Sequence, residues 1–264
     1  MRIAVLGGGV MGETLAAGLL ALQPRPDVVI AEKRADRAAE LAGAYGVALA
    51  EAAVAVAGAD VVILVVKPQD TQALLAEVGP CIEPGAVVIS IAAGIRTATI
   101  EAAVPDGVHV VRAMPNTPAR VGRGVTGVSA GAHCSPDAVA LVARLLGSVG
   151  IVEVVPEDLQ DAVTAVSGSG PAYLFYLAEA MTSAAVDLGL DEATATAMVN
   201  QTLLGAATLL STSDEPAADL RRKVTSPGGT TAAAIGVLDD RGVTGSVVEA
   251  ITAARDRGRE LAGS

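Results

Sequence analysis

The glycine-rich segment near the start of the chain is the first pattern that could do chemistry. Residues 7–12 read GGGVMG, which matches G-x-G-x-x-G between an apolar run and a helix-forming segment. In such a turn, backbone N–H groups at a helix N-terminus bind a pyrophosphate. A glycine turn without a ligand is the alternative, but the flanking elements and an acid about 20 residues further on favour a dinucleotide site. We expect the contacts from Gly7, Gly9, Val10, Met11 and Gly12.

The residues that close the second apolar run bear on which dinucleotide binds. Glu32 could accept hydrogen bonds from the ribose hydroxyls of NAD, whereas Lys33 and Arg34 could bind the 2′-phosphate of NADP. Alternatively, Lys33, Arg34 and Arg37 only begin a solvated helix. We expect NADPH as the cofactor, with NADH as the alternative.

Three further segments follow apolar runs, at the sheet edge where ligands bind in open α/β folds. Lys67 comes before Pro68, and it either borders a ligand or is a solvated charge. Residues 92–94 are small, so a flat ring could lie close to their backbone. Residues 112–118 read RAMPNTP and predict a rigid polar loop, or simply a turn.

Two glycine-containing motifs interrupt the helical second half of the chain. SGSGPAY occupies residues 167–173, and SPGGTT occupies residues 226–231. Two glycines before a helix N-terminus, followed by two hydroxyls, form a nest of N–H donors suited to a carboxylate. The alternative is a glycine-rich turn with Thr230 as the helix N-cap.

The elements that must position these motifs change in kind along the chain. Strands are expected at residues 3–6, 28–31, 61–66, 87–91, 108–111 and 151–155, with helices at 14–21, 36–44 and 71–78. Strands that are apolar throughout are typical of a parallel sheet covered on both faces. Residues 1–155 are thus predicted to form a Rossmann-type, doubly wound α/β domain. Residues 156–264 contain no strand-like run and predict an all-helical domain, whose apolar helices indicate a subunit interface.

Composition excludes several classes of partner. The net charge of −11 and an aromatic content of 2% argue against nucleic acid. No apolar run approaches the roughly 20 residues that cross a bilayer, so no membrane association is expected. Cys81 and Cys134 lack partners at metal spacing, and the first residues lack the regions of a signal peptide. We expect no metal, free thiols and a cytoplasmic location.

Six motifs in this order and spacing resemble the pyrroline-5-carboxylate reductase family: GGGVMG, VVKPQD, SIAAGI, RAMPNTPA, SGSGPAY and SPGGTT. The resemblance covers nearly the whole chain. It implies a Rossmann-type domain followed by a helical dimerisation domain, in a homodimer or a larger homo-oligomer. It also implies hydride transfer from NAD(P)H to the imine of 1-pyrroline-5-carboxylate, which gives L-proline.

The resemblance also implies residue roles. The nicotinamide ribose would lie beside Val66, Lys67 and Pro68, and the ring region beside Ala92, Ala93 and Gly94. The substrate would be bound by Ser226, Gly228, Gly229, Thr230 and Thr231, with the Thr231 hydroxyl orienting or protonating the imine nitrogen. The chain departs from the family at Ala52, where Asn is common, and at Glu32, where a small or basic residue is common.

Two other functions share parts of this pattern. A 3-hydroxyacid dehydrogenase of the same architecture would need a lysine or histidine acid/base in the helical half, where Lys223 is the only lysine. A non-catalytic dinucleotide sensor would keep the glycine loop but need no carboxylate nest.

Overall fold

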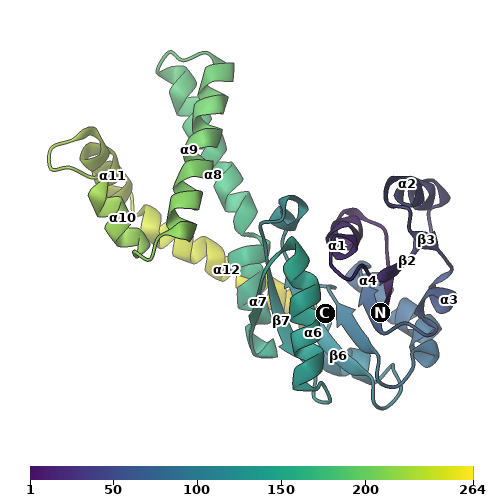
Figure 1. Ribbon diagram of the computed structural model, residues 1–264. Coiled ribbons are helices and arrows are strands. Elements are labelled where there is room, and N and C mark those ends of the chain that lie inside the picture. The colour runs from purple at the N-terminus through teal and green to yellow at the C-terminus, as the bar shows by residue number, and fades with distance from the viewer. Residues whose placement is uncertain (264) are drawn as a thin grey trace. The chain divides into compact units, whose positions relative to one another are not determined.

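The computed structural model describes residues 1–263, which form two compact units (Figure 1). Unit 1 comprises Met1–Ser169 and the C-terminal segment from Ala254, and unit 2 is Gly170–Ala253. Helix α12 (Val243–Gly263) therefore contributes to both units. These contact-based units have different limits from the predicted domains 1–155 and 156–264, which stay a prediction.

Unit 1 is built on one eight-stranded sheet with the order β3-β2-β1-β4-β5-β6-β7-β8. The strands are β1 (Arg2–Leu6), β2 (Asp27–Ala31), β3 (Ala48–Leu49), β4 (Val61–Leu64), β5 (Val87–Ser90), β6 (His109–Pro115), β7 (Gly124–Ala130) and β8 (Gly150–Val154). All neighbours pair in parallel except β6 and β7, which are antiparallel. The predicted doubly wound, Rossmann-type parallel sheet is confirmed, with β6 and β7 as its one antiparallel pair.

Helices cover both faces of the sheet, because alternate strand residues point to opposite sides. Ile3 and Val5 join the buried cluster beneath α1 (Val10–Leu20), α2 (Ala35–Tyr45) and α6 (Pro136–Leu146). Ala4 and Leu6 join the cluster beneath α3 (Ala52–Val56), α4 (Pro68–Val78) and α5 (Thr97–Glu101). Short helical turns complete unit 1: η1 (Gly79–Cys81), η2 (Thr117–Val121), η3 (Gly147–Val149), η4 (Glu157–Leu159), α7 (Gln160–Val163) and the π-helical turn η5 (Thr164–Gly168).

Two details correct the expectations for this unit. Strand β7, which reads GVTGVSA, was not predicted, because glycine and hydroxyl residues interrupt its apolar pattern. A Cβ on its Gly127 would lie 2.7 Å from Val163 Cγ1, so the helical turn packed there leaves no room for a side chain. Strand β6 continues through Pro115, so the polar loop predicted at residues 112–118 begins only at Asn116.

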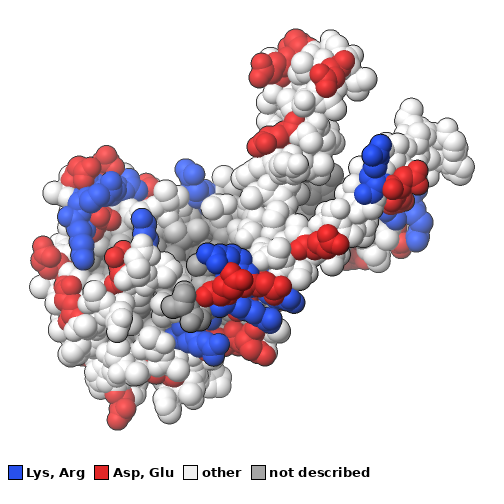
Figure 2. All heavy atoms as spheres, turned by 180° about the vertical axis from the view of Figure 1, so that it is seen from behind, with Lys and Arg blue, Asp and Glu red and all other residues white. Residues whose placement is uncertain are grey.

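Within its described residues, unit 2 contains helices joined by turns and no strand, as predicted. It contains α8 (Gly170–Asp187), α9 (Glu192–Thr212), α10 (Ala217–Lys223), α11 (Thr230–Asp240) and the first part of α12. Helices α8 and α9 pack against each other. Only Ala195 and Val199 of this unit are buried in the single chain. Helices α8 and α9 carry three acidic residues and no lysine or arginine, and most of their surface is white in Figure 2.

Candidate functional site

The predicted cofactor residues follow strands that end at one edge of the sheet. Parallel pairing aligns Leu6 of β1 with Ala31 of β2 and with Leu64 of β4, which in turn aligns with Ser90 of β5. The segments after these four strands therefore begin side by side. Strand β2 pairs with one side of β1 and β4 with the other, so the order in which strands are added to the sheet reverses here. Ligands of open α/β sheets bind at such switch points.

The glycines of residues 7–12 differ in what they make room for. Gly7 has φ +115°, and a Cβ there would lie 2.3 Å from the carbonyl oxygen of Val65. A Cβ on Gly12 would lie 2.0 Å from the carbonyl oxygen of Gly7, so both positions need glycine for folding. At Gly9, the N-cap of α1, an added Cβ would meet no heavy atom within 4 Å. The open space at Gly9 fits a ligand phosphate at the helix N-terminus.

The first turn of α1 supplies the donors for such an anion. Within residues 1–263, the backbone N–H groups of Gly9, Val10, Met11 and Gly12 make no hydrogen bond. Free N–H groups and the partial positive charge of a helix N-terminus together favour a bound anion. The loop residues present in this chain therefore fit a dinucleotide pyrophosphate.

Glu32 packs against the glycine loop, with its side chain 12% exposed. Its Oε2 accepts a hydrogen bond from the Gly8 N–H at 2.8 Å, and its Oε1 accepts one from the Arg34 N–H at 2.9 Å. The Glu32 carboxylate therefore stabilises the turn itself, a role that its position in the sequence did not reveal. Each carboxylate oxygen has a second lone pair, so contact with a ribose hydroxyl is still open to it.

The three cations after β2 do not behave alike. Lys33 and Arg34 are exposed, as a solvated helix start predicts. Arg37 has a side chain only 18% exposed, and its Nε donates to the Gly8 carbonyl oxygen at 2.9 Å. The interpretation of Arg37 as a merely solvated charge is therefore wrong.

The segments after β4 and β5 line up with the glycine loop at the same edge. Lys67 is the exposed N-cap of α4, and Pro68 is the first residue of that helix. The Ala92 N–H donates to Ser90 Oγ at 3.3 Å, and Gly94 has φ +77°. The structure thus brings Val66, Lys67, Pro68, Ala92, Ala93 and Gly94 to the edge that carries the glycine loop.

The predicted substrate residues gather in unit 2, at the N-terminus of α11. Gly228 has φ +71°, and the Gly229 N–H donates to the Ser226 carbonyl oxygen at 3.0 Å. Gly229 is the N-cap and Thr230 the first helical residue, so the alternative with Thr230 as the cap is wrong. Among the described residues, the hydroxyls of Thr230 and Thr231 make no hydrogen bond. Both hydroxyls are therefore available to a ligand.

Other groups of the molecule offer less chemistry. Lys223 is exposed, and its Nζ donates to Glu215 Oε1 at 2.5 Å. In the described chain, no three His, Cys, Asp or Glu side chains are placed to hold a metal ion, and both cysteines are free. None of the described helices is long and apolar enough to cross a membrane.

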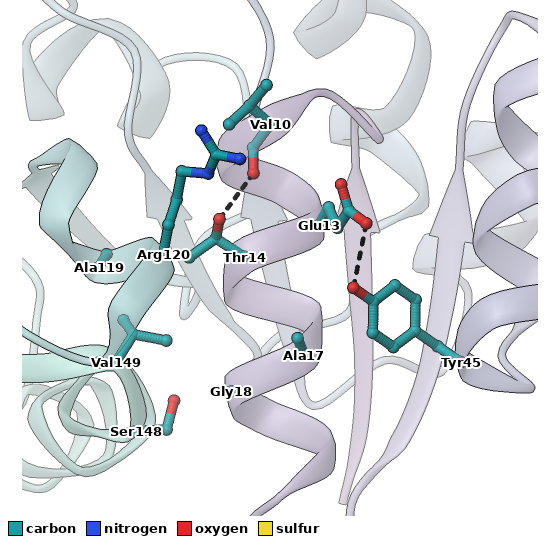
Figure 3. A pocket seen from close by; sticks show the side chains of 11 residues that line it. Val10, Glu13, Thr14, Ala17, Gly18, Tyr45, Ala119, Arg120, Ser148 and Val149 are labelled. Carbon is teal, nitrogen blue, oxygen red and sulfur yellow. Dashed lines mark hydrogen bonds between the residues drawn. The ribbon is translucent and has the colours of Figure 1, made fainter. Parts of the chain in front are cut away.

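A cavity of about 350 Å³ lies on the face of α1 that points away from the sheet (Figure 3). Its polar side chains come from Glu13, Thr14, Tyr45, Arg120 and Ser148, and Val10 is the one predicted site residue that lines it. Arg37 holds the pKa of Glu13 below its usual value, and hydrogen bonding to Glu13 raises the pKa of Tyr45. Sequence analysis gave no role to Glu13 or Tyr45.

A doubly wound sheet, a glycine loop open to a phosphate and free donors on α1 define a dinucleotide-binding unit of the oxidoreductase class. Comparison with known protein families supports this assignment to the oxidoreductases. Residues 2–94 match the family described as "NADP oxidoreductase coenzyme F420-dependent". Residues 157–261 match the family described as "Pyrroline-5-carboxylate reductase dimerisation".

Relatives match over nearly the whole chain. The chain is 44% identical to pyrroline-5-carboxylate reductase of Pseudomonas aeruginosa, covering 99% of this chain and 97% of that protein. Identity to the Mycobacterium tuberculosis enzyme of the same name is 41%, over 98% and 96% of the two chains. The solved structure from Coxiella burnetii superposes with a TM-score of 0.93 at 36% identity, over 98% of each chain. The chain belongs to the pyrroline-5-carboxylate reductase family.

Proposed function

We propose that this chain reduces the imine of 1-pyrroline-5-carboxylate with NADPH or NADH and releases L-proline. The 44% identity to the Pseudomonas aeruginosa enzyme, across 99% of the chain, carries the proposal. Neither earlier alternative has such support. The acid/base that a 3-hydroxyacid dehydrogenase needs has no candidate beyond Lys223, which is exposed and paired with Glu215.

The cofactor half of the proposal assigns roles in unit 1. The nicotinamide supplies the hydride when the dinucleotide is bound. The free N–H groups from Gly9 to Gly12 bind the pyrophosphate, and the open Gly9 position lets it approach the backbone. Val66, Lys67 and Pro68 border the ribose, and residues 92–94 border the ring.

The substrate half assigns roles in unit 2. The N–H groups at the start of α11, after Gly228 and Gly229, bind the substrate carboxylate, and Ser226 belongs to the same turn. The Thr231 hydroxyl orients the imine nitrogen or donates a proton to it. A cyclic imine is electrophilic already, so holding it in place can supply several kcal/mol without a strong general acid.

NADPH is the preferred cofactor in this proposal. The Plasmodium falciparum pyrroline carboxylate reductase was solved with NADP bound, and it is 26% identical with a TM-score of 0.85, over 100% of this chain and 98% of that one. In this chain, exposed Lys33 and Arg34 are available to a 2′-phosphate. Replacing both by alanine should raise the KM for NADPH about tenfold more than that for NADH. Equal increases in the KM for NADPH and the KM for NADH would show that Lys33 and Arg34 are only surface charges.

The assembly proposed is a homodimer, or a larger homo-oligomer, formed through unit 2. The dimerisation family matched at residues 157–261 and the exposed apolar side chains of α8 and α9 support it. Sedimentation velocity gives the oligomeric state directly. We also propose a cytoplasmic location, which fractionation of cells that express the tagged chain would test.

One set of assays separates the three functions considered. The first assay follows the oxidation of NADPH and NADH in the presence of pyrroline-5-carboxylate. The second follows the reduction of NADP and NAD in the presence of 3-hydroxyisobutyrate. The third measures cofactor binding without a substrate. The proposal expects turnover only with pyrroline-5-carboxylate. Turnover only with the hydroxyacid would support the dehydrogenase, and binding without any turnover would support a sensor.

A further inference from the structure

One side chain of α2 holds the peptide group between Gly8 and Gly9. Arg37 donates from Nε to the Gly8 carbonyl oxygen at 2.9 Å. In a trans peptide the carbonyl and the following N–H point in opposite directions. This hydrogen bond therefore turns the Gly9 N–H away from Arg37, at the one glycine of the loop where an added Cβ would meet no atom within 4 Å.

The guanidinium group of Arg37 donates its other hydrogen bonds to side chains of this chain. Its Nη2 donates to Glu13 of α1, and its Nη1 donates to Glu40 Oε2 at 3.0 Å. Each of its three nitrogens thus already has an acceptor within the chain. Lys33 has no hydrogen bond or ion pair within residues 1–263, and the Arg34 side chain is 64% exposed. Arg34 Nε lies 3.7 Å from Glu32 Oε1, yet the side chains of Lys33 and Arg34 are more exposed than that of Arg37, so they are the cations accessible to a 2′-phosphate.

Glu13 is in turn held on its other oxygen. Figure 3 shows the Tyr45 hydroxyl pointing from the end of α2 toward Glu13, and this hydroxyl donates to Oε1 at 3.0 Å. The Glu13 side chain is 33% exposed, so the group is partly shielded from solvent. Tyr45, Glu13 and Arg37 therefore form a continuous series of hydrogen bonds between α1 and α2 that ends on the Gly8 carbonyl.

We infer that Arg37 is a positioning residue for the dinucleotide, orienting the Gly8–Gly9 peptide so that the free N–H groups of residues 9–12 face the pyrophosphate. Because NADPH and NADH share this pyrophosphate, Arg37 serves both equally. Glu13 and Tyr45 hold Arg37 in place. The inference rests on the proposed function for the identity of the cofactor.

Two arginines three positions apart provide a matched test. In Arg37→Met, the dissociation constants of NADPH and NADH should rise by the same factor, about tenfold, because the lost bond acts on the shared pyrophosphate site. In Arg34→Met, the same substitution on an exposed side chain should weaken NADPH alone. Arg144→Met, on the exposed side of α6, should change neither.

Binding is measured by titrating nicotinamide fluorescence without substrate, and kinetics follow. In Arg37→Met, the KM for the cofactor should rise, while kcat at saturating cofactor stays within about twofold of wild type. A loss confined to NADPH would make Arg37 a 2′-phosphate ligand and overturn the inference. Unchanged binding of both cofactors would overturn it as well.

Removing Arg37 alone leaves Glu13 without its cation, which could disturb the fold rather than the loop. The double variant Glu13→Gln/Arg37→Met removes both charges and should melt near wild type while binding both cofactors weakly. Wild-type affinity in this double variant would also overturn the inference. Should the wild-type chain bind both cofactors but leave pyrroline-5-carboxylate unreduced, the proposed reaction fails, yet the role of Arg37 is still measured by binding alone.

Discussion

Unit 1 buries its apolar side chains within one chain, and unit 2 leaves most of its own exposed. In β1, residues Ile3, Ala4, Val5 and Leu6 are all at most 1% exposed. In α8 and α9, Phe175 is 64% exposed and Leu204 is 61% exposed. Burying one such side chain contributes about 1.5 to 3 kcal/mol, a gain that the proposed homodimer would supply to unit 2. The two units therefore differ in how much apolar surface they bury within a single chain, and the proposed homodimer would cover the exposed side chains of unit 2.

The two halves also hold their binding turns differently. The glycine loop of unit 1 is braced by Glu32 on the Gly8 N–H and by Arg37 on the Gly8 carbonyl. The turn before α11 is closed by one backbone bond, from the Gly229 N–H to the Ser226 carbonyl. Substitutions in the glycine loop of unit 1 should therefore change cofactor affinity, because that site is already arranged. Substitutions in unit 2 should change turnover and assembly.

Gly9→Val should have the largest effect. A side chain at Gly9 enters the space left for the pyrophosphate, so binding of NADPH and NADH should weaken about 100-fold or more, with Tm unchanged. Gly12→Val should instead lower Tm, because a Cβ there meets the Gly7 carbonyl oxygen at 2.0 Å. Gly43→Val, at an exposed position of α2 with no atom within 4 Å, is the control. Normal cofactor titration of Gly9→Val would refute our placement of the pyrophosphate.

Thr231→Val should lower turnover about 10- to 1,000-fold and leave cofactor affinity nearly unchanged, since it deletes only the hydroxyl proposed to contact the imine. Thr244→Val is matched to it, because Thr244 is the second residue of α12 as Thr231 is of α11. That control should turn over normally. A proline analogue with an intact carboxylate should compete with the substrate, and its carboxamide should bind more weakly. If Thr231→Val turns over at the wild-type rate and both analogues inhibit equally, the proposed substrate site at the N-terminus of α11 is refuted.

The third prediction addresses assembly. Leu204 of α9 and Val54 of α3 are both 61% exposed, one in each unit. Leu204→Glu places a charge in the proposed interface and should raise the dimer dissociation constant about tenfold or more. Val54→Glu should leave it unchanged. Sedimentation velocity over a range of concentrations distinguishes the two, and equal behaviour of both variants would break the contrast between the units.

Sequence patterns predicted the parts whose causes are local. Strands β1, β2, β4 and β5 carry short apolar runs because both faces of the sheet are covered. The helix N-termini at Gly9 and Gly229 were likewise marked by glycines next to helix-forming residues. In each case the pattern that marks the element lies within a short stretch of the sequence.

The parts that were missed depend on contacts between distant residues. Gly127 in β7 is explained by Val163, which belongs to a later helical turn. Arg37 and Gly8, which are hydrogen-bonded, are 29 positions apart in the sequence, and Tyr45 and Glu13 are 32 positions apart. No periodic spacing in the sequence predicts either pair. The bracing of the cofactor loop therefore became visible only in the folded chain.

The smallest expected effect concerns pH. Arg37 and Tyr45 lower the pKa of Glu13 below 4.5, and nearby Arg120 acts in the same direction. A carboxyl whose folded-state pKa is lowered adds stability above the unfolded-state pKa and loses it as the pH falls through the folded-state value. Wild type should therefore melt about 1 to 3 °C above Glu13→Gln at pH 7, a small margin because partly exposed ion pairs contribute little.

The Tm difference between wild type and Glu13→Gln should become smaller below pH 4.5. Asp191 in unit 2 provides the counterpart, since it caps α9 by accepting from the Thr194 N–H at 3.0 Å. Hydrogen bonds from the side chain and then the backbone of Thr194 lower the pKa of Asp191. Asn is also a good N-cap, so Asp191→Asn should shift Tm less than Glu13→Gln does at pH 7. Thermal melts of both variants between pH 3 and pH 7 check the comparison. A Tm difference for Glu13→Gln that grows on acidification would contradict the assigned direction, and with it the account of the ion pair that holds Arg37 against the loop.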